Sequence, residues 1–384
     1  MSGFRLASRS RREQLSLYSL VNQSNIKQLS RIALNCNNYK RNVLECIFQI
    51  NQNNPCNSNN VTYYSPNRVF ILDPSGVSTW QGICSYNNQV ILCGTTMPSA
   101  TAGAGVIYIG NIQCTDPSGQ YIKFYVPGSK YTSCYGPRYD SDTELLSFVG
   151  SYNNPGDNYT YGFLFVGSLN ELTDSTKYIY KMQPNNDEYP ITFVHSTYGN
   201  FAVGASGNLP PKNLQDKAWI YDITQQIYTD FKFNNATYNT IYGIVQNSEY
   251  NYTIVGGFSD LSQNITTGFI CDFDYDPQTY NLTYSNQTSI QITSITHFEG
   301  ISKTRDSNVY TLAADLETGG AGIIVGRNFI SSKFDVISIQ RIDYSCSIGS
   351  EGFTTSNSVL GNNFIGYFIS SNNNSSAWQC SVNF

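Results

Sequence analysis

Short apolar runs, separated by polar segments rich in Asn, Ser and Gly, recur along the chain beyond about residue 75. Each recurrence has the same order: a Gly or similar residue after a polar or aromatic one, an apolar strand ending in a small residue, and a second strand opened by a small residue. The small residue that ends the middle strand falls at positions 94, 150, 204, 256, 313 and 366. Six recurrences with a period of about 50 residues and several short strands each are typical of propeller blades.

Each recurrence has room for four antiparallel strands. In the fourth recurrence, apolar runs that are either alternating or continuous predict four strands, at residues 240–245, 252–258, 267–273 and 289–295. Turn-rich segments separate these strands. Composition agrees, because the chain has 30 Tyr, 21 Phe and only 13% charged residues, and aromatic residues suit a pleated, half-buried surface. We therefore predict an all-β fold, a six-bladed β-propeller of four-stranded blades.

The last recurrence is one strand short. It ends at Phe384, in its third strand, whereas residues 61–72 form an unassigned apolar strand before the first recurrence. An unpaired sheet edge invites aggregation, and a closed ring removes the edge. We therefore place residues 61–72 outermost in the last blade, so that the N-terminal strand closes the ring and the propeller spans residues 61–384.

Residues 1–60 differ from the rest in charge. They hold eight Lys and Arg and two Glu, a net charge of +6, within a chain whose net charge is −5. The remaining body is therefore acidic, which argues against nucleic-acid binding by phosphate neutralisation. We interpret residues 1–60 as a basic N-terminal arm and linker, with loose helical spacing over residues 10–34, and we favour a solvated, partly disordered arm. The alternative is that the arm contacts an acidic partner, a membrane surface or nucleic acid.

At the fourth recurrence the sequence resembles the HAF-type extracellular repeat. The resemblance rests on Tyr242-Gly243-Ile244, on the strand Tyr252 to Phe258 with its Val-Gly pair, and on Gly268-Phe269-Ile270. It covers most of residues 78–384 at the level of pattern, and the third and fifth recurrences lack some of the glycines. The resemblance implies a surface-associated repeat protein and carries no catalytic residue to this chain.

The sequence gives mixed indications of location. No run of 18 apolar residues is present, so no membrane span is expected, and no apolar segment follows the basic N-terminus as in a signal peptide. Asn-x-Ser/Thr sequences are nevertheless dense, either because the protein is a secreted glycoprotein or because Asn, Ser and Thr are common in it. We expect an extracellular, cell-surface or virion location. The acceptor positions are Asn22, Asn60, Asn158, Asn235, Asn251, Asn264, Asn281, Asn286, Asn373 and Asn374.

Ten cysteines are present and no Cys-x-x-Cys pair, which disfavours zinc and thioredoxin-like chemistry. Disulfides are typical of oxidising compartments. Cys84 and Cys93 lie on consecutive strands of the first recurrence, so a cross-strand disulfide between them is our prediction. Two buried free thiols are the alternative, since free Cys behaves as a small buried hydrophobe.

Motifs for catalysis or for cofactor binding are absent from the sequence. The chain has two histidines, and it has no Gly-x-Ser-x-Gly elbow, no Walker loop and no Gly-x-Gly-x-x-Gly segment. Asp272, Asp274 and Asp276 would share one face of a strand and could hold Ca²⁺, but Pro277 stands where a calcium loop needs Gly. We favour a solvated face there, and we predict no metal and no cofactor.

The candidate site comes from equivalent positions in the recurrences. In each recurrence, the residue just before the first Gly, or before the residue that replaces this Gly, is polar or aromatic, unlike the apolar strand positions around it. In a propeller, equivalent positions of successive blades form a ring about the axis. A ring of convergent polar groups is a binding-site candidate; the alternative, which we favour, is that these side chains satisfy turn backbone groups between blades. The predicted binding residues are Gln81, Tyr135, His195, Tyr242, Glu299 and Glu351.

These observations favour a non-enzymatic structural or binding protein whose propeller faces bind protein or glycan. The alternative is a carbohydrate-active enzyme, a lyase or glycosidase, that uses Glu299 and Glu351 as paired carboxylates at the axial mouth. A deep pocket with close carboxylates would favour the enzyme, and a filled axis would favour the binding protein.

Overall fold

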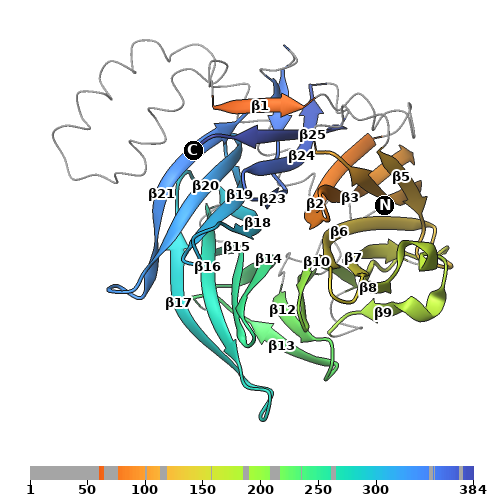
Figure 1. Cartoon of the computed structure of the whole chain (residues 1–384), viewed down its shortest axis with the longest axis horizontal. Helices are drawn as coiled ribbons and strands as arrows, with labels where there is room; N and C mark the ends of the chain where they lie inside the picture. The colour runs from red at the N-terminus through yellow and green to blue at the C-terminus, as the bar shows by residue number, and fades with distance from the viewer. Residues whose placement is uncertain are drawn as a thin grey trace.

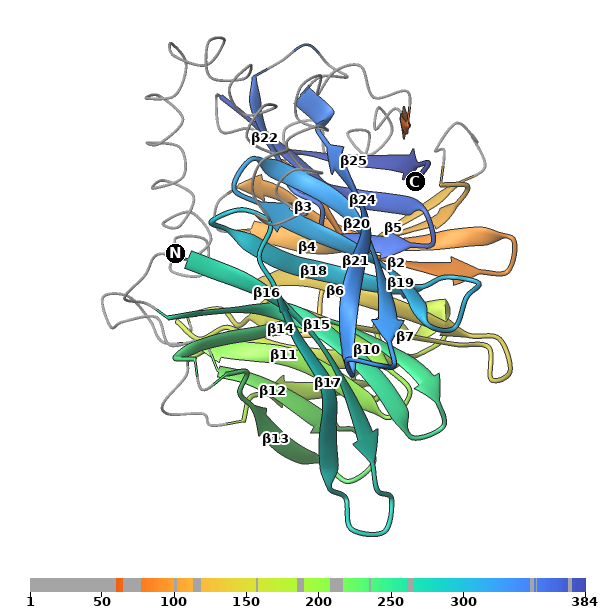
Figure 2. The same cartoon turned by 90° about the vertical axis from the view of Figure 1, so that its left-hand side faces the viewer.

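The structure, a computed structural model, is built almost entirely of β-strands (Figures 1 and 2). Figure 1 shows the sheets arranged around a centre on which β2, β6, β10, β14, β18 and β23 converge. Two single-turn 3₁₀ helices, η2 (Leu169–Glu171) and η3 (Ser175–Lys177), interrupt the strands. The described residues are 60–64, 77–99, 102–112, 119–156, 158–184, 190–207, 217–234, 236–260, 265–345, 349, 351–371 and 375–384.

Three sheets are separate four-stranded antiparallel meanders, each following chain order. This arrangement confirms the prediction of an all-β propeller with four-stranded blades. The strands are β10 (Ile191–Tyr198), β11 (Phe201–Gly207), β12 (Lys217–Asp222), β13 (Ile227–Phe231), β14 (Tyr238–Ser248), β15 (Asn251–Asp260), β16 (Ile265–Tyr275), β17 (Leu282–Ile290), β18 (Thr296–Lys303), β19 (Val309–Leu316), β20 (Gly319–Asn328) and β21 (Lys333–Ile342).

A fourth separate sheet joins the two ends of the described chain. Its strands are β1 (Val61–Tyr64), β22 (Gly352–Thr354), β23 (Ser358–Leu360), β24 (Asn363–Ser370) and β25 (Ser375–Val382). The N-terminal strand β1 pairs antiparallel with β25, as predicted for a closing strand. The Tyr63 ring packs edge-on against Tyr344 and Trp378, and the Tyr63 hydroxyl accepts a 2.7 Å hydrogen bond from the backbone N–H of Asp343. The closing strand is therefore held by side chains as well as by the ladder.

The first two recurrences differ from the prediction of six separate blades. Hydrogen bonds join their strands into one eight-stranded sheet, so the structure has four separate blades beside this sheet. The junction is a single parallel pair, Gly103 of β4 with Tyr131 of β6. Gly103 has no side chain, so the Tyr131 ring can lie close to its backbone; a Cβ atom on residue 103 would be only 2.4 Å from that ring. This close approach lets the pair form. The strands are β2 (Val77–Tyr86), β3 (Gln89–Ser99), β4 (Ala102–Gly110), β5 (Gln120–Phe124), β6 (Tyr131–Asp140), β7 (Leu145–Asn153), β8 (Tyr161–Gly167) and β9 (Tyr178–Met182).

The hydrophobic core lies between neighbouring sheets. One cluster joins Val255 and Ile270 of the β14–β17 sheet to Leu312 and Ile323 of the β18–β21 sheet. The small residue that ends each middle strand has a local cause: a Cβ on Gly256 would lie 1.9 Å from the carbonyl oxygen of Thr240 on the inner strand. At Gly256 the small residue thus reflects close backbone approach, where Gly fits without strain; the fifth recurrence has Ala at the equivalent register position, Ala314 opposite Phe298.

Some sequence predictions concern residues outside the described ranges. The helical segment at 10–34, the rest of the basic arm up to residue 59, and residues 65–72 lie there. The division between residues 1–60 and 61–384 stays a prediction.

Candidate functional site

Most of the predicted ring residues lie at β-bulges. The strand register skips Gln81 in β2, His195 in β10, Tyr242 in β14 and Glu299 in β18, and it is irregular just after Tyr135 in β6. A bulge adds one residue to an inner strand and re-aims its side chain. The sequence reasoning therefore found a recurring backbone irregularity, which explains why these positions are polar or aromatic among apolar neighbours.

The sixth predicted residue, Glu351, is not at the equivalent position. Glu351 is exposed and precedes β22, and its carbonyl accepts a bond from Ser371. The equivalent residue is Asn357, which lies between β22 and β23 and whose N–H donates to the Ile365 carbonyl. The error arose because the inner strand is split here, so that the landmark Gly352 belongs to its first half. The predicted carboxylate pair Glu299 and Glu351 is consequently not brought to matching ring positions.

Aromatic contacts connect the ring residues of successive sheets. The ring centroids of Tyr135 and His195 are 5.5 Å apart, those of His195 and Tyr242 are 3.7 Å apart and stacked, and those of Tyr242 and His297 are 4.7 Å apart and edge-on. The side-chain amide of Asn357 donates a 2.9 Å hydrogen bond to the Trp80 carbonyl of the first inner strand. The inner strands are thus joined around the axis by side chains.

His195 is deeply buried, with only 8% of its surface exposed. Burial, and then the nearby charge of His297, lower the pKa of His195 from 6.5 to about 3. Its Nδ1 atom has no hydrogen-bond partner among the described residues. His195 is therefore a neutral, stacked imidazole at ordinary pH.

His297, which the sequence reasoning left out of the ring, contacts two groups on different sheets. Its Nε2 lies 2.7 Å from Thr240 Oγ1 of β14, and its Nδ1 lies 2.8 Å from Glu299 Oε1 of its own strand. Thr240 is buried, and its hydroxyl also lies 3.4 Å from the Gly257 carbonyl. A hydroxyl, an imidazole and a carboxylate are close together here, but Thr240 is buried and so is closed to a substrate. The only indication in the sequence that His297 belongs to this site is its position two residues before Glu299, the residue at the bulge.

On the other side of the ring, the side chain of Gln81 joins two strands. Its Oε1 accepts hydrogen bonds from Thr95 at 3.0 Å and from Ser133 at 3.2 Å, and the Thr95 and Ser133 hydroxyls are 2.8 Å apart. Tyr135 is close to this cluster, and burial raises the pKa of its phenol. These contacts match the alternative interpretation, in which ring residues satisfy polar groups between strands.

The acidic segment at residues 272–276 does not form one solvated face. Asp272 is 1% exposed, and its Oδ1 lies 3.0 Å from Arg327 Nη2 of the adjacent sheet. Asp274 accepts from Asn251, and Asp276 accepts from the N–H of Gln278 in the following turn. Among the described residues, no three His, Cys, Asp or Glu side chains are grouped so that they could hold a metal ion.

The predicted disulfide does not match the strand register. Cys84 lies opposite Ile91, whereas Cys93 lies opposite Gly82, and both thiols are free. Burial, followed by a hydrogen bond to Cys134, raises the pKa of the Cys93 thiol. The two-residue turn at Asn87 and Asn88 pairs Tyr86 with Gln89 and therefore sets Cys84 opposite Ile91, a register that the sequence pattern alone does not show.

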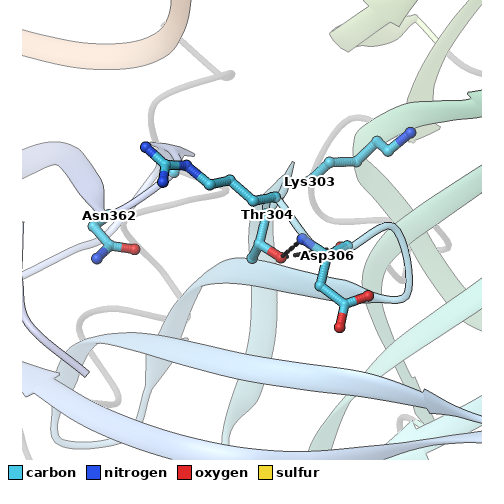
Figure 3. Close-up of a pocket in the computed structure, with 6 residues that line it drawn as sticks. Lys303, Thr304, Asp306 and Asn362 are labelled. Carbon is cyan, nitrogen blue, oxygen red and sulfur yellow. Dashed lines mark hydrogen bonds between the residues drawn. The ribbon is translucent and has the colours of Figure 1, made fainter.

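A surface pocket of about 630 Å³ lies between two turns of adjacent sheets (Figure 3). We call it the turn pocket; it is formed by the β18–β19 turn and by the β23–β24 turn. The Thr304 hydroxyl accepts a hydrogen bond from the Asp306 N–H at 3.2 Å, which orders the first turn. Its residues come from different recurrences, so no single motif could indicate it. They are Lys303, Thr304, Arg305, Asp306, Gly361 and Asn362.

Comparisons with known proteins give likenesses in structure only. No family model matches and no curated protein matches, so the resemblance to the HAF-type repeat stays a prediction. A chain from the cryo-EM structure of RAG with one melted and one unmelted RSS is 11% identical, with TM-score 0.47, covering 84% of this chain and 100% of that one. The periplasmic gluconolactonase of Pseudomonas aeruginosa is 7% identical, with TM-score 0.45, covering 79% and 85%. A hypothetical selenium-binding protein from Sulfolobus tokodaii is 10% identical, with TM-score 0.44, covering 79% and 79%.

One of these likenesses corrects the sequence analysis. The prediction that the chain is not an enzyme was wrong as an exclusion, because a gluconolactonase is among the structurally similar proteins. The likenesses are too distant to assign any activity, and the named functions are unrelated to one another. Separately, no helix among the described residues is long and apolar enough to cross a membrane.

Proposed function

We propose that this chain is a binding protein, and that it docks an acidic protein partner through the hairpin turns of the β18–β21 sheet. The observation that carries the proposal is the apolar tip, the β20–β21 turn at residues 328–333. Phe329 is 68% exposed and Ile330 is 99% exposed there. Large apolar side chains that remain in water at a projecting turn suit an interface, where aromatic residues concentrate binding energy.

The apolar tip is held in one shape. The side-chain oxygen of Asn328 accepts the N–H of Ile330 at 3.0 Å and of Ser331 at 3.2 Å, while its amide donates to Asp335 at 2.7 Å. Figure 1 shows this hairpin and the β16–β17 hairpin extending beyond the other strands. A preformed turn loses little conformational freedom on binding, which favours affinity.

The apolar tip and the turn pocket are parts of one rigid surface. The backbone N–H of Arg327 donates to the Asn308 carbonyl at 2.8 Å, and Asn308 donates its own N–H to Asp306 of the turn pocket at 3.0 Å. The two turns are therefore connected through one backbone hydrogen bond and one bond from a backbone N–H to the Asp306 carboxylate. A partner could contact both at once without rearranging the propeller.

Charge selects the kind of partner. Besides the paired Arg327, the two turns carry the cations Lys303, Arg305 and Lys333 against Asp306 and Asp335. The neighbouring projecting hairpin instead carries Asp274 and Asp276 and no cation between residues 274 and 281. These charges sum to +1 on an acidic body, and a locally positive surface favours an acidic partner.

We also propose that the ring has six blades. The parallel pair that joins β4 to β6 has counterparts at two other junctions, Thr160 with Ile191 and Thr266 with Ile295. In both counterparts the start of a third strand meets the start of the next inner strand. The eight-stranded sheet then consists of two blades, β2–β5 and β6–β9, joined by the same contact.

A displayed peptide library tests the partner. The wild-type protein should select peptides rich in Asp and Glu around an aliphatic or aromatic residue, and 0.5 M salt should weaken the selection because it screens exposed charges. The double variant Phe329→Ser, Ile330→Ser should lose the selection. Ile227→Ser, which changes a 45% exposed residue of β13, is the matched control and should keep it. Selection of neutral or basic peptides, or selection unchanged in the double variant, would contradict the proposal.

A further inference from the structure

The turn pocket presents cationic and amide donors beside the apolar tip. Arg305 is exposed and has no hydrogen-bond or ion-pair partner among the described residues. None of the described residues engages the five N–H donors of its guanidinium, whose planar arrangement matches the oxygens of a carboxylate or phosphate. An unpaired guanidinium at the wall of a pocket is a ready anion-binding group.

The other cation of the turn pocket has partners. The Lys303 ammonium lies 3.3 Å from the Gln246 carbonyl and 3.4 Å from the Asn247 carbonyl of the β14–β17 sheet. Figure 3 shows Lys303 extending away from Asn362. Lys303 therefore adds positive potential, while the direct contacts to an anion fall to Arg305 and Asn362.

The β23–β24 turn supplies a fixed second wall. The Gly361 N–H donates to Ser302 Oγ at 2.9 Å, and the Asn362 carbonyl accepts the Val382 N–H at 2.9 Å. These backbone bonds hold the turn and leave the Asn362 side chain exposed. Its amide can donate to the same anion, because Asn362 and Arg305 line one pocket.

Asp306 sets the selectivity of the turn pocket. One of its oxygens accepts the Asn308 N–H, and Figure 3 shows its carboxylate and Asn362 on opposite sides of the pocket. Because Asp306 also lines the turn pocket, its negative charge repels a ligand that carries several anionic groups. The turn pocket is thus shaped for a single charged group rather than for a polyanion.

We infer that the turn pocket binds one anionic side chain of the partner, a carboxylate or a phosphate, through Arg305 and Asn362. The inference rests on the proposed function for the identity of the partner and on the turn pocket alone for the chemistry. Carboxylate and phosphate share the same recognition by guanidinium. Which of the two is preferred is decided by measurement.

The experiment uses the whole protein and small probes, with the ¹⁵Nε–Hε NMR signals of arginine as the readout. Inorganic phosphate and free glutamate are titrated separately, with glucose as the neutral probe. We expect one signal, missing in Arg305→Gln, to shift saturably with phosphate or glutamate and not with glucose. Comparison of the two anions then identifies the preferred group.

Variants separate the turn pocket from the rest of the surface. Arg305→Gln should weaken anion binding by about tenfold or more, since a hydrogen bond to a charged group is worth that much. Asp306→Asn should strengthen it several-fold, and Lys123→Gln, which removes an exposed cation from β5, should leave it unchanged. Linear, unsaturated shifts of several arginine signals, or equal effects of Arg305→Gln and Lys123→Gln, would overturn the inference.

The double variant Phe329→Ser, Ile330→Ser distinguishes this inference from the proposed function. It should retain saturable anion binding while losing the peptide selection. If peptide selection depends on the apolar tip but no anion saturates the turn pocket, the inference fails and the proposed function stands. If the anion binds but the tip variant selects peptides normally, the proposed function fails and the pocket chemistry stands.

Discussion

The hydroxyl of Thr240 on one sheet lies 2.7 Å from Nε2 of His297 on the next. Because both groups are buried, neither can exchange this contact for water. A buried polar group that loses its partner keeps its desolvation cost. The contact therefore joins two inner strands that no ladder hydrogen bond connects.

Removing this partner should destabilise the protein measurably. Thr240→Val should lower the free energy of unfolding by about 1–3 kcal/mol, because it leaves His297 Nε2 unpaired. Denaturant unfolding measures the change. Thr237→Val, at an exposed position of the same segment, is the control and should change stability by less than about 0.5 kcal/mol. Equal effects at the two positions would show that the Thr240 contact contributes nothing.

The burial of His195 predicts a pH dependence. Its pKa is about 3 in the folded protein and 6.5 when unperturbed, so between these values the unfolded chain binds a proton that the folded one does not. Stability should be full above about pH 6.5 and should fall as the pH drops toward 3, by at most about 1.4 kcal/mol per pH unit. His195→Phe should retain the stack on Tyr242 and flatten this slope. An unchanged slope in the variant would assign the acid sensitivity to other groups.

The ion pair between Asp272 and Arg327 gives a third test. Arg327→Met should cost about 3–5 kcal/mol, because it leaves a buried carboxylate without its cation. Adding Asp272→Asn should restore part of this loss, since the amide carries no charge. Thermal or denaturant unfolding of the two variants measures the difference. A double variant that is less stable than Arg327→Met would show that the Asp272 carboxylate does not destabilise the protein when Arg327 is removed.

The corrected ring position can be tested directly. Asn357→Ala removes a 2.9 Å hydrogen bond to the Trp80 carbonyl and should cost about 1 kcal/mol. Glu351→Ala changes an exposed residue and should have almost no effect. Urea unfolding of both variants decides between them, and the reverse order would restore Glu351 to the ring.

The closing strand makes a prediction about truncation. A chain without residues 1–73 lacks β1 and exposes the edge of β25, so it should aggregate. A chain without residues 1–55 keeps β1 and should fold. Static light scattering of the purified proteins, with far-ultraviolet circular dichroism as a check on folding, compares them. Identical behaviour of the two truncations would show that β1 does not close the ring.

The repeat pattern predicted the meanders, the closing strand and five ring positions, because backbone geometry repeats with the sequence. It failed at Asn357, where a split strand moves the equivalent position beyond the expected glycine. It also failed at Cys84 and Cys93, because the turn at Asn87 and Asn88 pairs Tyr86 with Gln89 and so sets Cys84 opposite Ile91. Periodicity does not encode such local shifts.

The turn pocket and the apolar tip were missed for another reason. Arg305 and Asn362 are far apart in the sequence and meet only because two turns of adjacent sheets lie side by side. In the sequence, Ile330 lies in an ordinary run of polar and apolar residues, and only the folded turn shows that its side chain is exposed. Contacts between repeats, unlike those within one repeat, leave no period in the sequence.

The bonds of Arg327 also bear on how the protein would respond to a pulling force. Its backbone holds the base of the apolar tip to Asn308, and its guanidinium reaches Asp272 on the neighbouring sheet. A load applied by a bound partner at the tip is thus shared between two sheets rather than peeling one hairpin open. Single-molecule pulling from residue 330 should therefore show a higher rupture force in the wild type than in Arg327→Met.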